Sequence, residues 1–233
     1  MTAPPATAPS SQTAEKIEAA RRSLTFVTTG MVVGLGSGST AAEMVRLLGE
    51  KVRAGLLVRG IPSSAETRRL AIAEGIPLTD FDAVPIIDVT IDGADEVDPT
   101  GGMIKGRGGA LLHEKILAAH SRRLVIAIDS SKQVVQLGTR TPVPVEVIPL
   151  AAPLVARELR GWGAEVKLRG AEGGTPFISD EGNQILDCHF GLIDDPQALA
   201  LRLDRLVGVV EHGLFLGLAP TLVVGVAPPA RRP

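Results

Sequence analysis

The feature that most constrains the fold is an alternation of short apolar runs with helical patterns through the first half of the chain. Apolar runs that fit buried strands occur at 31–36, 56–59, 86–91 and 124–128. Helical spacing or helix-start signals occur at 15–27, 41–48, 65–74 and 110–119. Strand followed by helix, several times over, predicts an α/β fold with a doubly wound, mostly parallel sheet flanked by helices. Ligands on such sheets bind beyond the carboxyl ends of the strands.

The second half has a different composition, and three prolines within 142–149 mark the change. Beyond them the sequence predicts a helix at about 153–162, a strand at 165–168, a hairpin centred on 180–183 and a helix at 196–206. Asp-Glu-Gly-Asn at the hairpin is typical of a turn between antiparallel strands. We therefore expect a smaller α+β domain.

The expected organisation has four parts. A main Rossmann-like catalytic domain is predicted at 14–139 plus about 208–226, with final strands at 209–210 and 222–224 that return to the main sheet. The smaller domain is predicted at 140–207. Residues 1–13 are expected to be disordered and 227–233 to be frayed, because proline and small polar residues bury too little apolar surface to offset the ordering entropy.

Composition narrows the class of protein. Hydrophobic residues make up 45% of the chain but aromatic residues only 3%, so the core must be aliphatic, which suits a parallel sheet. Twenty-four basic against 26 acidic residues give a net charge of −2 with no dense basic tract, which argues against a nucleic-acid partner.

Location in the cell can also be predicted. The longest apolar stretch, 214–226, is too short to span a bilayer and contains Gly217 and Pro220, and the N-terminus has no secretory signal pattern. The single cysteine, Cys188, has no second thiol for a disulfide or a zinc site. We expect a protein of the reducing cytoplasm that does not bind a membrane.

A glycine-rich loop at 34–40, Gly-Leu-Gly-Ser-Gly-Ser-Thr, lies between a predicted strand and a predicted helix. Free backbone N–H groups at a helix N-terminus, with hydroxyls beside them, favour a small phosphate. The third glycine of a dinucleotide fingerprint is replaced by Ser39, and the lysine of a P-loop is missing. A tight turn with no ligand remains the alternative for this motif taken alone.

An acidic loop follows the predicted strand at 86–91, with Asp92 and Asp95 separated by Gly93 and Ala94. The small residues leave room for a ligand, and this spacing in a turn can direct both carboxylates at one point. Oxygen ligands also suit Mg²⁺ or Ca²⁺, but EF-hand spacing is absent and no histidine is close in the sequence. A solvated acidic turn is the third possibility.

The segment 105–109, Lys-Gly-Arg-Gly-Gly, precedes a predicted helix that carries Glu114 one turn in. Its lysine and glycines favour a second anion or oxyanion site, and helical side chains point back toward the N-terminus, which directs Glu114 at that site. Alone, such a glutamate is a surface charge. Lys132 follows the strand at 124–128. All four signals lie at the carboxyl ends of predicted strands, which predicts that they form one site.

Together these segments resemble ribose-5-phosphate isomerase of type A. The resemblance rests on five motifs in the family's order, at 34–40, 92–96, 105–115, 131–134 and 144–149, and extends from 14 to 226. It implies interconversion of ribose 5-phosphate and ribulose 5-phosphate through an enediol intermediate, in the non-oxidative pentose phosphate pathway. It also implies no cofactor, no metal, and a homodimer or homotetramer.

The resemblance also implies residue roles. Glu114 matches the general base that carries a proton between C1 and C2, and Asp92, Asp95 and Lys105 match groups around the sugar oxygens that open the ring and stabilise the oxyanion. His113 stands where many members have arginine, and it either makes activity sensitive to pH or is a surface histidine with no such role. Substrate binding is implied for Asp92, Asp95 and Lys105 and for Ser37, Gly38, Ser39, Thr40, Gly93, Ala94, Gly106, Arg107, Gly108, Lys132 and Lys16.

The chemistry agrees with these residue types. Removing a proton next to a carbonyl needs a carboxylate whose pKa is lifted toward neutrality. Burial and Asp92 or Asp95 would raise the pKa of Glu114 while Lys105 would lower it, and the sequence does not rank these effects.

Two alternative functions are also considered for this sequence. One is a sugar-phosphate sensor domain, which needs a DNA-binding module for which we expect no room before Ala14. The other is a metal-dependent phosphatase or hydrolase that uses the acidic loop and would lose activity with EDTA.

Overall fold

The structure is a computed structural model that describes residues 10–227. Its first helix, α1 (Ser11–Ser23), begins four residues before the helix predicted at 15–27, so residues 11–13, which were expected to be disordered, are helical. The reason is an N-cap, because Ser10 Oγ accepts a hydrogen bond from the Thr13 backbone N–H at 3.2 Å. The disorder expected for 1–9 and the fraying expected for 228–233 lie outside the described residues.

The main sheet has five strands in the order β12-β6-β3-β1-β2, and every pairing is parallel. These strands are β1 (Val32–Leu35), β2 (Arg59–Pro62), β3 (Val89–Asp92), β6 (Leu124–Ile128) and β12 (Thr221–Val224). Along the chain, β2 pairs with one edge of β1, and β3 then pairs with the opposite edge of β1. Because the order reverses between β1 and β3, a crevice opens outside their carboxyl ends, where ligands of such sheets bind.

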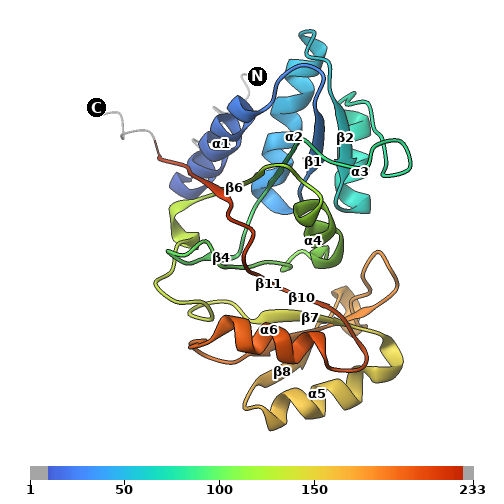
Figure 1. Cartoon of the computed structure of the whole chain (residues 1–233), viewed down its shortest axis with the longest axis vertical. Coiled ribbons are helices and arrows are strands. Elements are labelled where there is room, and N and C mark those ends of the chain that lie inside the picture. Colours follow the sequence, from blue (N-terminus) through green and yellow to red (C-terminus); the bar gives the residue numbers. More distant parts are fainter. Residues whose placement is uncertain (1–9, 228–233) are drawn as a thin grey trace, which may run out of the picture.

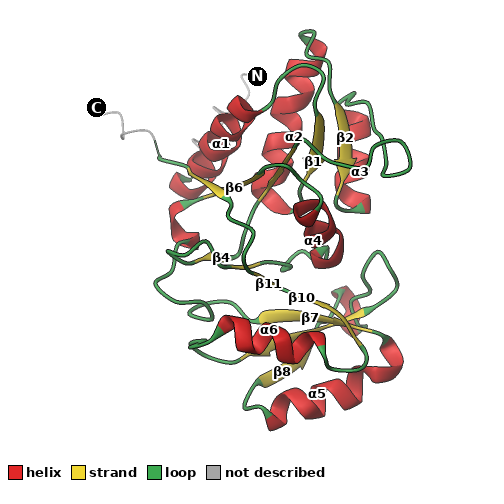
Figure 2. Ribbon diagram, in the orientation of Figure 1, coloured by secondary structure: helices red, strands yellow, loops and turns green. Residues whose placement is uncertain are grey.

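Both faces of this sheet are covered (Figures 1 and 2). One face packs on α1, α2 (Gly38–Arg53) and α3 (Ala65–Ala73) through an aliphatic core that includes Leu35 and Met44. The other face packs on α4 (Leu111–Ala119) and on a three-stranded antiparallel sheet of order β11-β5-β4. The strands of that sheet are β4 (Glu96–Val97), β5 (Met103–Ile104) and β11 (Leu214–Phe215).

A smaller unit lies below the main sheet in the view of Figure 2, and it consists of a four-stranded antiparallel sheet of order β10-β7-β9-β8 with two helices. Its elements are β7 (Val143–Val147), α5 (Ala152–Gly161), β8 (Glu165–Leu168), β9 (Gln184–His189), α6 (Pro196–Asp204) and β10 (Val209–His212). We call it the small unit. Short 3-10 helices occur at Leu24–Phe26, Ser130–Lys132, Pro149–Ala151 and Glu172–Gly174. The predicted fold class is confirmed.

Two expectations about strands need correction. The strand expected at 209–210 does not return to the main sheet, because β10 pairs antiparallel with β7 of the small unit, Val209 opposite Val147. Only four residues separate β10 from α6, and this short connection keeps β10 beside the sheet on which α6 packs. The second strand is β2 at 59–62 instead of 56–59, and its final Pro62 is tolerated because β2 is an edge strand.

Candidate active site

Asp92, the last residue of β3, joins the two loops that meet at the switch point. Its Oδ1 accepts hydrogen bonds from the backbone N–H of Ser37 at 3.0 Å and of Gly93 at 2.7 Å. A Cβ atom on Gly36 would lie 2.2 Å from Asp92 Oδ1, so only glycine permits this approach. The glycine-rich loop and the acidic loop are therefore fixed to one another by a single carboxylate.

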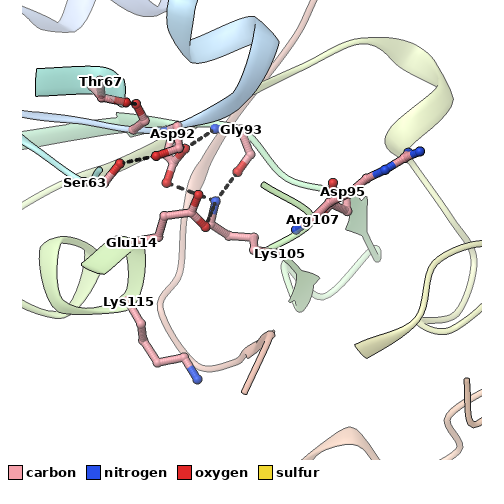
Figure 3. A network of polar contacts seen from close by, with 12 residues as sticks. Ser63, Thr67, Asp92, Gly93, Asp95, Lys105, Arg107, Glu114 and Lys115 are labelled. Atoms are coloured by element: carbon pink, nitrogen blue, oxygen red, sulfur yellow. Dashed lines mark hydrogen bonds and ion pairs between the residues drawn. The ribbon is translucent and has the colours of Figure 1, made fainter. Parts of the chain in front are cut away.

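Lys105 directly follows β5, and its side chain points toward Asp92 and Glu114, as Figure 3 shows. Its ammonium donates to the Gly93 carbonyl at 2.5 Å and lies 3.0 Å from Asp92 Oδ2 and 3.2 Å from Glu114 Oε2. The ring of Phe215 lies 5.4 Å from Nζ. With only 4% of its surface exposed, this cation depends on the carboxylates for its stability.

Glu114 lies in the first turn of α4 and is 4% exposed. Within residues 10–227 its Oε2 has no hydrogen-bond partner, although it faces the Lys105 ammonium as an ion pair. Burial is the largest influence and raises the pKa of Glu114 to about 7; Lys105 lowers it and Asp92 raises it. The structure thus ranks the effects that the sequence left open, and the carboxylate is ready to exchange a proton near neutral pH.

For the Lys105 ammonium, burial has a smaller effect on the pKa than the neighbouring charges have together. Burial lowers the pKa of Lys105, but the carboxylates of Asp92 and Glu114 outweigh burial, so its pKa is raised above the ordinary value. Lys105 therefore stays positively charged throughout the range in which Glu114 gains or loses its proton. Since Nζ occupies the position between the two carboxylates, these oxygens do not form the open cage of a divalent cation site.

One cavity brings together every predicted site residue except Asp92, which is buried beneath it at 2% exposure. The cavity adds one residue, Ile128, at the carboxyl end of β6. The predicted residues that line it are Lys16, Ser37, Gly38, Ser39, Thr40, Gly93, Ala94, Asp95, Lys105, Gly106, Arg107, Gly108, Glu114 and Lys132.

One side of the cavity is suited to an anion. Ser37 Oγ hydrogen-bonds with Ser63 Oγ at 2.6 Å instead of capping α2, and the first backbone N–H groups of a helix have no partner inside it. Lys132 contributes a positive charge from the 3-10 helix after β6. Lys16 contributes another, because Glu15 Oε2 accepts from Ser130 N–H at 2.8 Å and holds α1 against this end of the sheet.

The other side is formed by the acidic loop and the segment 105–109. Asp95 Oδ2 accepts from the Arg107 backbone N–H at 3.0 Å, and the Asp95 N–H donates to the Ile104 carbonyl at 2.8 Å. Figure 3 shows Asp95 and Arg107 side by side, away from the Lys105 cluster. The cavity therefore extends from a helix N-terminus flanked by Lys16 and Lys132 to a polar floor formed by the Glu114 carboxyl group and the Lys105 ammonium.

The family model described as ribose 5-phosphate isomerase A (phosphoriboisomerase A) matches residues 59–228. The chain belongs to this family. A ribose-5-phosphate isomerase A from Gloeobacter violaceus is 53% identical over 210 residues, 90% of this chain and 91% of the relative. One from Gluconobacter oxydans is 52% identical over 211 residues, again 90% and 91%.

Solved structures agree with the sequence comparison. A D-ribose-5-phosphate isomerase in complex with phospho-erythronic acid is 42% identical, with a TM-score of 0.87 over 90% of this chain and 93% of that one. Ribose 5-phosphate isomerase A from Methanocaldococcus jannaschii is 40% identical, with a TM-score of 0.84 over 91% and 96%. The predicted family membership is confirmed over nearly the whole chain.

His113, beside Glu114 on α4, is not an isolated surface side chain. Its Nε2 lies 2.7 Å from Glu181 Oε1 in the small unit, and its side chain is 30% exposed. An effect of His113 on the pH dependence stays a prediction. The sequence reasoning also missed Ile128, which its place at the end of a predicted strand could have indicated, and Phe215, for which the sequence has no signal.

Proposed function

We propose that this isomerase A family member interconverts ribose 5-phosphate and ribulose 5-phosphate, and that Glu114 is its base. The observation that supports this best is the pair formed by Glu114 and Lys105 at the floor of the cavity. A carboxylate with a pKa of about 7 and a buried permanent cation lie 3.2 Å apart, opposite an anion-binding helix N-terminus. Proton transfer next to a carbonyl requires these two groups together.

The proposed reaction is a proton transfer between adjacent carbons of the open-chain sugar. The Glu114 carboxylate takes the proton from C2, the electron pair forms the C1–C2 double bond, and the carbonyl oxygen on C1 gains the negative charge. The O2 hydroxyl proton then passes to the O1 oxyanion, the C2–O2 double bond forms, and the electron pair of the C1–C2 double bond takes the proton back from Glu114 at C1, which gives the ketose. The Lys105 ammonium stabilises the oxyanion of the enediolate, because its charge is fixed before the reaction begins.

Asp95, which lines the cavity, is proposed to accept hydrogen bonds from sugar hydroxyls and to assist ring opening. Asp92 acts on the chemistry through Lys105, whose ammonium it holds at 3.0 Å. The phosphate is proposed to bind at the N-terminus of α2 with Ser37 to Thr40, Lys16 and Lys132. Binding energy from this remote group would keep the reacting carbons in register with Glu114.

Location and assembly are part of the same proposal. Among residues 10–227, no helix combines the length and apolar character needed to span a membrane. Cys188 is fully buried, and burial raises the pKa of its thiol to about 12, which fits a structural residue in a reducing cytoplasm. A homodimer or homotetramer is proposed from the resemblance, and light scattering of the purified chain would test it.

The function is tested by following ketose formation from ribose 5-phosphate, with and without EDTA. We expect ketose to form at the same rate in both. Absence of ketose would contradict the proposed function, and loss of activity with EDTA would favour the metal-dependent hydrolase or phosphatase instead.

A further inference from the structure

The loop 106–109, Gly-Arg-Gly-Gly, directly follows Lys105, and its first three residues line the cavity. Gly106 and Gly109 have φ angles of +102° and +88°, which favour glycine, and glycines leave the backbone free to move. Two backbone N–H groups of the loop donate hydrogen bonds. Gly109 N–H donates to the Gly106 carbonyl at 3.0 Å, and Arg107 N–H donates to the Asp95 carboxylate at 3.0 Å. A loop of this kind needs contacts from outside to keep one conformation.

Arg169, which follows β8 in the small unit, supplies such a contact. Its Nη1 donates to the carbonyl oxygens of Gly106 at 2.8 Å and of Arg107 at 3.1 Å. The other edge of the guanidinium binds both carboxylate oxygens of Asp187 on β9, with Nε to Oδ2 at 3.0 Å. This planar fork therefore joins the loop to a strand of the small unit, and only 12% of the side chain is exposed.

Phe177 supports the same loop. A Cβ atom on Gly109 would lie 2.4 Å from Phe177 Cζ, so the ring packs directly on the loop backbone. The Arg169 guanidinium lies 5.9 Å from the ring centroid, and the Phe177 N–H donates to the Arg169 carbonyl at 2.8 Å. The two side chains therefore contact the loop from one segment of the small unit and contact each other.

The loop matters because of what precedes it. The Lys105 backbone is fixed on its N-terminal side by β5 and by the hydrogen bond from its N–H to the Gly213 carbonyl at 2.9 Å. On its C-terminal side it continues directly into the loop. A displacement of Gly106 would therefore rotate Lys105 and move its ammonium relative to Glu114.

We propose that Arg169, held by Asp187 and supported by Phe177, is a positioning residue that fixes the loop 106–109 and thereby the Lys105 ammonium against Glu114. Arg169 is absent from the cavity lining, so it acts through the loop and not on the substrate. The inference rests on the proposed isomerase function. It gives the small unit a role in catalysis beyond packing.

The test compares Arg169→Ala with Arg160→Ala on ribose 5-phosphate. Arg160 is a matched control, because it also lies in the small unit and donates one hydrogen bond, to the Val166 carbonyl at 3.1 Å, without reaching the loop. We expect kcat of Arg169→Ala to fall about tenfold or more, since small misplacements of catalytic groups have effects up to about 10²-fold. KM should change much less because the phosphate site is untouched, and Arg160→Ala should keep wild-type kcat.

Two further measurements separate positioning from loss of structure. Added guanidinium ion should restore part of the kcat of Arg169→Ala by occupying the vacated space, while urea at the same concentration should not. The double variant Arg169→Ala/Asp187→Ala removes the carboxylate left without a partner, so its Tm should exceed that of Arg169→Ala while kcat stays low.

Three results would overturn the proposal: wild-type kcat in folded Arg169→Ala, an equal loss in Arg160→Ala, or no rescue by guanidinium ion. A wild-type chain that forms no ketose would contradict the proposed function itself, which keeps the two failures distinct.

Discussion

Replacing Lys105 with methionine should destabilise the protein in a way that depends on pH. The ammonium lies 3.0 Å from Asp92 and 3.2 Å from Glu114, and the three side chains are 4%, 2% and 5% exposed. Removing one partner of a buried ion pair leaves an uncompensated charge and costs roughly 3–5 kcal/mol of unfolding free energy. Methionine keeps most of the side-chain volume, so lost packing adds little.

The sign of the pH dependence follows from Glu114. Lys105 is the main group that lowers the pKa of Glu114, so in Lys105→Met this pKa rises further above its ordinary value of 4.5. A carboxyl with a raised pKa in the folded state keeps its proton there and loses it in the unfolded state. Stability is therefore highest below the unfolded pKa and falls as pH rises toward the folded pKa. The destabilisation should therefore be smaller near pH 5 than above about pH 8, because Glu114 keeps its proton at the lower pH, while the loss of the Asp92 contact adds to it throughout.

Urea unfolding of wild type and Lys105→Met across this pH range measures the effect. Lys167→Met is a suitable control, because Lys167 pairs with Glu165 at 2.7 Å but is 67% exposed, and its loss should change stability little at any pH. A destabilisation of Lys105→Met that is the same at every pH, or no larger than that of the control, would refute the reasoning.

Three further predictions concern the rest of the site. The kcat/KM of wild type should rise with pH to a plateau with a midpoint near pH 7, as Glu114 loses its proton, and a flat profile would contradict this assignment. Ser39→Ala and Lys132→Ala should chiefly raise KM, and unchanged KM values in steady-state assays would argue against a phosphate site there. Gly36→Ala should lower the Tm, with a loss of about 1–3 kcal/mol from overpacking against Asp92; a wild-type melting curve would contradict it.

The parts of the fold that the sequence predicted correctly are those in which local pattern and tertiary packing agree. The strands at 124–128 and 165–168 have the predicted bounds, because each apolar or alternating run is also the segment that pairs. At 86–91 the local pattern and the tertiary packing disagree. Ile86 is 47% exposed, and β3 begins only at Val89, where pairing with Val33 starts. Hydrophobicity alone does not reveal where a neighbouring strand begins.

The site was predictable to a similar degree and for a different reason. Residues such as Asp92 and Lys132 follow strands, and parallel strands bring their carboxyl ends to one edge, so sequence order implied nearness in space. The contacts of Arg169 and Phe215 were not predictable, because they come from segments whose positions depend on how the small unit packs. The pKa of Glu114 needed the structure as well, since it reflects the balance between burial and the Lys105 charge.

The central claim is that Glu114 is the base of a ribose 5-phosphate isomerase, and Glu114→Gln tests it most directly when assayed beside wild type with EDTA present. Glutamine keeps the size of the side chain but does not accept the proton. We predict that kcat falls by roughly 10²- to 10⁴-fold while a non-reacting phosphorylated sugar acid still binds. Wild-type turnover by the Glu114→Gln variant would contradict the account.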